Sequence, residues 1–414
     1  MVGLRVGEKQ ISNDLFSLEN MVVATFVVPI LFNYLTEIFM AYGLPSLISL
    51  SYIIIFILYA FIIGKAFLLN SLGIFLVLFI GTFAIFFSCV ITPEITEYVF
   101  TANTEGYYGF LTSNFMSYFT RCLVMVIAFV ARIDVKKLTE CLTRCSVFIV
   151  LSYIILNFVN FSHLGHSTQY MNNAYSALIP VALLYNKGIS EKKVLNVLLS
   201  LLAGFFLLVS GSRGAAITFI AFIFLYHIIA GEFTSKKLMI IVFACALMIA
   251  FVYNLDSIFS WLAQFFKKFG ISTRLIDLIN GSESGIYRSD GRVLIYETAL
   301  ERIEIIGGGL FFDRCITSYA YAHNFILEVL LDFGLILGIP ILLIIGYKIF
   351  RFAKKAHNIE TIMVWVPIVL ASFLVHYMFS ASFLIAQDFW IMIGIIFTVA
   401  SSKFLAVEPM EYKV

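Results

Sequence analysis

The sequence predicts an all-α, polytopic membrane protein with about twelve transmembrane helices and one long extracytoplasmic loop. Hydrophobic residues make up 61% of the chain and charged residues 13%, whereas soluble proteins have about 45–50% apolar and about 25% charged residues. Apolar runs of about 20 residues, the length that crosses a bilayer as a helix, recur along the chain. We therefore expect residues 1–414 to form a single transmembrane domain.

The expected spans follow the apolar runs, and the fifth and sixth are short. They are placed at about 21–41, 44–63, 71–92, 112–131, 145–160, 173–186, 194–211, 214–230, 237–253, 324–347, 361–380 and 386–404. No small-residue cleavage site follows the first apolar run, so we expect no cleaved signal peptide.

Basic residues predict the orientation of these spans. Lys and Arg favour the cytoplasmic side in short loops. Connections 92–111 and 161–172 contain neither, whereas the connections on either side of them do. Both termini are therefore expected in the cytoplasm. The long polar loop, residues 254–322, is expected outside, because segments of more than about 60 residues cross largely regardless of charge.

Segment 92–111 combines carboxylates with aromatic rings, since Glu94, Glu97 and Glu105 stand among tyrosines and a phenylalanine. This combination suits carbohydrate, whose faces stack on rings while its hydroxyls form hydrogen bonds. An aromatic belt at the membrane interface is the alternative explanation.

Two helices are predicted within the long outer loop. Residues 255–269 are amphipathic and contain a tryptophan, as expected of a helix lying on the membrane surface. Further along, Asp290 is expected to cap a helix over about 291–305. That helix would place Arg292 and Tyr296 on one side.

Arg213 is a candidate anion ligand because it follows an apolar run, between Gly211 and Gly214. An ionisable group at the edge of a span is costly unless it is paired or used. A guanidinium presents a fork that matches phosphate oxygens. Together with Arg288 and Arg292, it would hold a diphosphate. The alternatives are an Arg213 that snorkels to lipid headgroups and loop arginines that are solvated or paired with neighbouring acids.

His323 begins a predicted span on the outer face. Imidazole takes up a proton near neutral pH, so His323 is a candidate general base toward a sugar hydroxyl. A structural histidine is the alternative. Glu328 and Asp332 follow in the same predicted helix, where they either pair with buried cations, orient neighbours or serve helix packing.

Charge and motif content exclude other classes of function. The net charge of +2 is small and its basic residues are dispersed, so we expect no nucleic-acid partner. The six cysteines have no metal-type spacing, and no nucleotide-binding loop or nucleophile elbow is present. We therefore expect no metal and no cofactor.

Four motifs, in this order, resemble those of the O-antigen ligase/polymerase superfamily. The long outer loop and about twelve spans agree with that family as well. The motifs are SGSRGA at 210–215, SDGR at 289–292, GGG at 307–309 and AHN at 322–324.

This resemblance implies a metal-independent membrane glycosyltransferase that uses an undecaprenyl-diphosphate-linked glycan. By the family's pattern, Arg213 and Arg292 would hold the diphosphate, and His323 would activate the acceptor hydroxyl. Arg288 matches the family's loop arginine as well as Arg292 does. A tyrosine stands at 296, where the family often has tryptophan. We expect supporting roles for Asn324, Glu328 and Tyr296.

The expected function is an O-antigen polymerase in lipopolysaccharide biosynthesis, acting at the outer face of the bacterial inner membrane. It would transfer the growing glycan to a new lipid-linked repeat unit. Its partners would be undecaprenyl-diphosphate-linked oligosaccharides, membrane lipid and a chain-length regulator protein. An O-antigen ligase, which transfers the glycan to the lipid A-core, is the alternative. A flippase for lipid-linked glycan is a further one.

Overall fold

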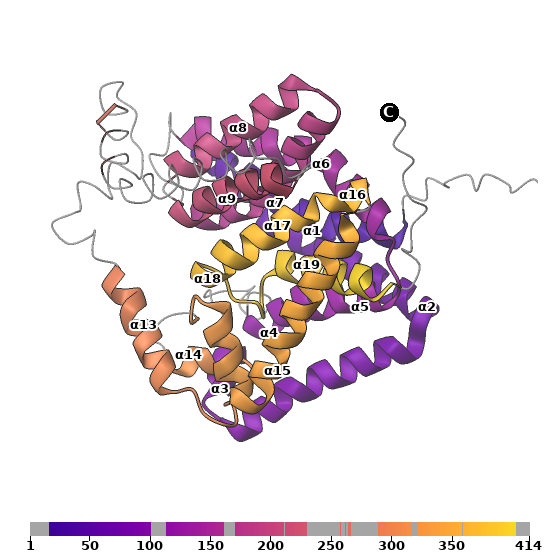
Figure 1. Ribbon diagram of the computed structural model, residues 1–414, viewed down its shortest axis with the longest axis vertical. Helices are drawn as coiled ribbons and strands as arrows, with labels where there is room; N and C mark the ends of the chain where they lie inside the picture. The colour runs from indigo at the N-terminus through magenta and orange to yellow at the C-terminus, as the bar shows by residue number, and fades with distance from the viewer. Residues whose placement is uncertain are drawn as a thin grey trace, which may run out of the picture.

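The fold is known from a computed structural model, which describes residues 16–100, 113–160, 170–210, 212–229, 289–316, 321–357 and 359–402, with isolated positions between 257 and 265. Within these ranges every regular element is a helix (Figure 1). The all-α prediction is thus confirmed for the part of the chain that the structure describes.

Five of the described helices are long and apolar enough to cross a membrane. Many of their large apolar side chains are exposed, as lipid contact requires and as water disfavours. They are α1 (Leu18–Ala41), α2 (Ile48–Ile91), α6 (Val135–Val159), α15 (Phe325–Ala356) and the run formed by α16 (Glu360–Met363), α17 (Trp365–Ala371), η4 (Ser372–His376) and α18 (Tyr377–Phe379).

Further helices are shorter or less apolar. They overlap the other predicted spans except 237–253, which lies outside the described residues. They are α4 (Asn114–Ser117), η2 (Tyr118–Leu123), α5 (Val124–Val130), α7 (Tyr170–Ser190), α8 (Val194–Val209), α9 (Arg213–Ile229) and α19 (Gln387–Ser401).

One predicted boundary of the fifth span was wrong, namely its start. Helix α6 begins at Val135, ten residues before the predicted start. The reason is an N-cap, because the Asp134 carboxylate accepts hydrogen bonds from the amides of Lys136 (2.9 Å) and Lys137 (3.2 Å). A capped first turn tolerates basic residues that hydropathy alone assigns to a loop.

The helices form one bundle with a polar group of short helices at one end. Helix α1 packs against α2 and α6, α7 against α6 and α8, and α19 against α15 and α5. Figure 1 shows α3 (Ile95–Phe100), α13 (Ser289–Glu301) and α14 (Phe312–Ile316) grouped beside α15. The α13 boundaries correct the predicted helix over 291–305, because Asp290 lies inside the helix instead of capping it.

Helix α15 is not straight, which corrects the predicted single span over 324–347. Its backbone leaves helical geometry at Gly334 (φ 67°, ψ −175°). A Cβ placed on Gly338 would lie 3.1 Å from the carbonyl oxygen of Val329. In a straight helix these residues would be about 13 Å apart along the axis. The two arms of α15, a first arm over 325–333 and a second over 335–356, therefore fold back toward each other.

The loop around Gly307–Gly309 satisfies the carbonyls that this bend frees. The amide of Gly308 donates to Leu331 O (3.1 Å), and the amide of Gly309 donates to Asp332 O (2.9 Å). An unpaired backbone carbonyl in an apolar setting is costly. The glycine run therefore pairs with the backbone at the bend of α15.

The amides that follow the bend are satisfied by the same loop. Leu335 N donates to Glu304 O (3.0 Å), and Ile336 N donates to Ile305 O (3.2 Å). Both carbonyls and both amides are therefore paired, so the break in α15 leaves none of these four groups unsatisfied.

Replacing Gly334 with alanine should destabilise the protein. The backbone there is in a region that is essentially restricted to glycine, which costs other residues about 1–3 kcal/mol. An alanine Cβ would also lie 2.4 Å from Gly307 N. The midpoint of thermal unfolding in detergent should fall for Gly334→Ala. Gly346→Ala is the matched control on the same helix, because nothing lies within 4 Å of its Cβ position. Equal midpoints for the two variants would contradict the bend.

Candidate functional site

Several predicted site residues meet at segment 376–388, which runs from the end of η4 through α18 to the start of α19. The Tyr296 hydroxyl lies 3.3 Å from Met378 O and 3.4 Å from His323 O. The Asn324 side-chain amide donates to the same Met378 carbonyl (3.4 Å). These contacts place α13, the start of α15 and segment 376–388 side by side.

His323 precedes Asn324, the N-cap of α15, and has a left-handed backbone conformation (φ 54°). Its ring contacts Tyr321, with 4.0 Å between ring centroids, and Tyr321 donates a hydrogen bond to Ser380 O (2.8 Å). Left-handed backbone in a residue other than glycine is uncommon and is often found at functional sites. The histidine is half-buried, so its imidazole is placed by its surroundings and not left in open solvent.

Asn324 explains why α15 begins where it does. Its side-chain oxygen accepts hydrogen bonds from the amides of Ile326 (3.0 Å) and Leu327 (3.1 Å). This is the standard N-cap arrangement, which satisfies two otherwise unpaired amides. The Ala-His-Asn motif is therefore a helix start, with its histidine one residue before the N-cap.

Arg213 is the first residue of α9. A Cβ on its neighbour Gly214 would lie 2.0 Å from the Tyr175 hydroxyl oxygen, so α9 and α7 approach each other closely here. The Tyr175 ring stacks on His376, with 4.1 Å between centroids and 6° between planes. The start of α9 thus adjoins one end of segment 376–388, while His323 and Tyr296 adjoin its middle.

The predicted loop arginines are only partly located. Arg292 belongs to α13, one helical turn before Tyr296. Arg288 and the side chains of Arg213 and Arg292 lie outside the described residues. The structure therefore brings together the backbone positions 213, 296 and 323 around one segment.

Segment 376–388 contains an ionisable pair, His376 and Asp388. His376 Nδ1 lies 3.7 Å from Asp388 Oδ2, and the Tyr377 hydroxyl donates to that oxygen (2.8 Å). His376 ends η4, a π-helical turn, and such turns are frequent at functional sites. The His376 ring stacks on Tyr175, which adjoins the start of α9.

A buried ion cluster adjoins the residue before His323, and its Arg314 and Asp313 were missed in the sequence, whereas pairing with a buried cation was one of the expectations for Glu328 and Asp332. It consists of Arg314 with three carboxylates, those of Asp313, Glu328 and Asp332. Arg314 lies 2.7 Å from Asp313 Oδ1 and 3.7 Å from Glu328 Oε1, and its side chain is 2% exposed. Among the described residues no group of three or more His, Cys, Asp and Glu is arranged to hold a metal ion.

The electrostatics of Arg314 follow from this arrangement. Burial alone would lower the pKa of its guanidinium, but the neighbouring carboxylates, Asp313 first, raise the pKa above its ordinary value. The side chain is therefore a permanent buried cation. One signal was available in the sequence: two adjacent opposite charges lie between apolar residues at 310–312 and 315–316.

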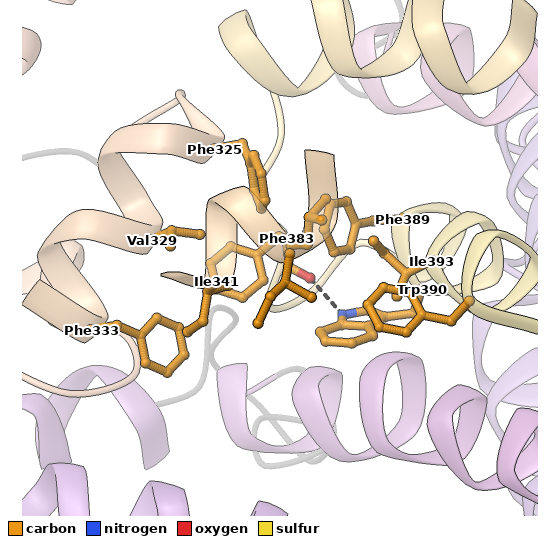
Figure 2. Close-up of a pocket in the computed structure, with 11 residues that line it drawn as sticks. Phe325, Val329, Phe333, Ile341, Phe383, Phe389, Trp390 and Ile393 are labelled. Atoms are coloured by element: carbon orange, nitrogen blue, oxygen red, sulfur yellow. Dashed lines mark hydrogen bonds between the residues drawn. The ribbon is translucent and has the colours of Figure 1, made fainter. Parts of the chain in front are cut away.

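An apolar cavity of about 280 Å³ lies between the two arms of α15 and α19. Figure 2 shows Phe325 and Val329 on the first arm facing Phe389 and Ile393 of α19. The Trp390 indole donates to Phe383 O (2.7 Å) and closes one wall. Phe325, one of the lining residues, lies two residues after His323.

Comparisons with known proteins found no family model and no curated protein that matches the chain.

Gly214→Ala should disturb the contact that joins α9 to segment 376–388. The new methyl group would displace the Tyr175 ring from His376, so the thermal midpoint should fall. Adding Tyr175→Phe removes the clashing hydroxyl, and the next ring atom lies 3.2 Å from the Cβ position. The double variant should therefore be more stable than Gly214→Ala alone, with Tyr175→Phe as the control. Additive losses in the double variant would contradict this contact.

Proposed function

We propose that this protein is a polymerase of lipid-linked surface glycan. The observation that carries the proposal is the approach of two predicted motifs, at Arg213 and His323, to segment 376–388. They lie far apart in the sequence, yet each contacts that segment directly or through one residue. Tyr296, one turn after Arg292, contacts both the segment and His323.

The proposed reaction is a glycosyl transfer that needs one base and one anion site. The acceptor's sugar hydroxyl oxygen attacks the anomeric carbon of the donor, and the carbon–oxygen bond to the diphosphate breaks. His323 takes the hydroxyl proton. Arg213 with Arg292 or Arg288 stabilises the leaving polyprenyl diphosphate, which departs with the bonding electron pair.

The apolar cavity supports a lipid-linked donor. Its lining is entirely hydrophobic, and Phe325 connects it to the His323 region. A polyprenyl chain is apolar throughout its length, and the few isoprene units nearest the diphosphate would lie in this cavity while the diphosphate stays at the polar site. The proposed partners are therefore undecaprenyl-diphosphate-linked oligosaccharides, with a chain-length regulator acting beside them.

We place the protein in the bacterial inner membrane with both termini in the cytoplasm and the site outside. Lys354 and Lys355 lie in the last turn of α15, at the far end from Gly334. Basic residues at that end favour the cytoplasmic side. The Gly334 end, together with α3, α13 and α14, would then face outward.

Two other functions use the same observations. A ligase would share the donor chemistry and differ in its acceptor, the lipid A-core. A flippase is favoured by one structural finding, because α2 is interrupted at Asn70 and α15 at Gly334. Interrupted helices are typical of transporters. The ionisable cluster beside His323, in contrast, favours catalysis.

The function is tested by the surface glycan of a deletion strain that carries variants. Deletion of a polymerase should leave one repeat unit on the surface lipid, while loss of a ligase or a flippase should leave none. His323→Ala and Arg213→Ala should reproduce the deletion pattern at normal protein abundance in the membrane. His357→Ala and Arg144→Ala, at other described positions of the chain, should retain long glycan.

The readout is the electrophoretic ladder of the glycan, with membrane abundance measured by immunoblot. Long chains in both His323→Ala and Arg213→Ala would remove their catalytic roles. A ladder with no single-unit band after deletion would contradict the polymerase and favour one of the alternatives.

A further inference from the structure

Two strained backbone positions flank the buried ion cluster. Four residues other than glycine have a positive φ within the described chain. Arg132 and Lys192 follow the ends of α5 and α7, where left-handed backbone is usual. Phe311 (φ 71°) and His323 (φ 54°) follow no helix end. Their strain must be balanced by surrounding contacts.

A carboxylate holds the backbone next to each strained residue. Asp313 Oδ2 accepts a hydrogen bond from the amide of Ala322 (2.8 Å), directly before His323. Asp332 Oδ1 accepts one from the amide of Phe312 (3.1 Å), directly after Phe311. Both carboxylates are buried, with at most 2% of the residue exposed. Hydrogen bonds from amides to buried carboxylates are among the stronger ones in proteins.

Arg314 fixes the carboxylate that holds Ala322. Its Nη1 donates to Asp313 Oδ1 (2.7 Å), so the two oxygens of Asp313 face Arg314 and Ala322 respectively. Its Nη2 donates to Ser382 Oγ (2.9 Å). The guanidinium also lies 4.5 Å from the centre of the Phe311 ring. Its planar fork holds these partners at fixed angles, which a lysine would not do.

Glu328 joins the cluster to segment 376–388 from the other side. Its carboxylate accepts hydrogen bonds from the Ser382 hydroxyl and from the amide of Phe383 (3.1 Å). Ser382 thus contacts both Arg314 and Glu328. The cluster connects three parts of the chain, namely α14, the first arm of α15 and segment 376–388. All three border His323.

We propose that Asp313 and Arg314 are positioning residues that set the backbone of Ala322 and His323 and thereby aim the imidazole at its substrate. This inference rests on the proposed function, in which His323 is the general base. Asp313 touches the chain at the residue before His323, and Arg314 acts through Asp313. Neither residue needs to touch the glycan.

The test measures kinetics of the purified full-length protein in lipid nanodiscs. The substrate is the polyprenyl-diphosphate-linked oligosaccharide extracted from cells that lack the protein. For Asp313→Ala, kcat should fall about 100-fold, which is the effect of a misplaced catalytic group, while KM should change less than about threefold. The kcat of Asp313→Asn should fall less, because the asparagine amide oxygen still accepts a hydrogen bond from the amide of Ala322. Glu301→Ala, an exposed carboxylate on α13, is the control.

Arg314 variants separate positioning from folding. Arg314→Met leaves buried carboxylates uncompensated and is expected to unfold. Arg314→Lys keeps the charge and loses the fork, so folded protein should form with kcat reduced at least tenfold. If Asp313→Ala does not fold, Asp313→Asn and Arg314→Lys carry the test. Unchanged kcat in both folded variants would overturn the proposal.

A second readout does not depend on enzyme activity. Diethyl pyrocarbonate modifies accessible imidazoles, and mass spectrometry of peptides gives the rate for each histidine. The rate at His323 should change more than threefold in Asp313→Asn or Arg314→Lys, with the rate at His357 unchanged. An unchanged rate at His323 would overturn the positioning role. If His323→Ala retains full activity while the modification rate at His323 still changes in Asp313→Asn or Arg314→Lys, the proposed function fails and the positioning of His323 stands.

Discussion

The structure depends on the four backbone hydrogen bonds that close the break in α15. A break inside an apolar helix leaves carbonyls and amides without partners, which a membrane environment does not supply. Here the loop around Gly307–Gly309 provides those partners. Because they are all satisfied, the two arms can fold back on each other. The bend at Gly334 then determines where the first arm and His323 lie.

The bend also explains the buried charges. It carries Glu328 and Asp332, both on the first arm, to α14, where Arg314 pairs with Glu328 and Asp313. Three carboxylates around one guanidinium would be unfavourable in an apolar interior without hydrogen bonds. Amides of Ala322, Phe312 and Phe383 provide them. The hydrogen bond from the Ala322 amide to Asp313 therefore links the cluster to the strained backbone at His323.

Helix locations were largely predictable from the sequence, because the length of an apolar run directly reflects a bilayer crossing. The start of α15 was predictable as well, since Asn324 is a typical cap. The start of α6 was not, because the Asp134 cap outweighs the hydropathy of its first turn.

The bend and the cluster were not predictable, because both arise from contacts between distant parts of the chain. One glycine at 334 does not reveal that residues 304–309 lie against it. Arg314 and Ser382 are 68 residues apart. Segment 376–388 reads as the end of one span and the start of another. Its role as the meeting point of Tyr296, Asn324 and the Tyr175–His376 stack appears only in three dimensions.

The central claim is that backbone positions 213 and 323 lie close to each other beside segment 376–388. Cross-linking tests it most directly, with Arg213→Cys and His323→Cys introduced together into a variant whose native cysteines have been replaced. A short bis-maleimide should link this pair, while Arg213→Cys paired with His357→Cys should remain unlinked. Efficient linking of the control pair, or none between 213 and 323 in folded protein, would contradict the claim.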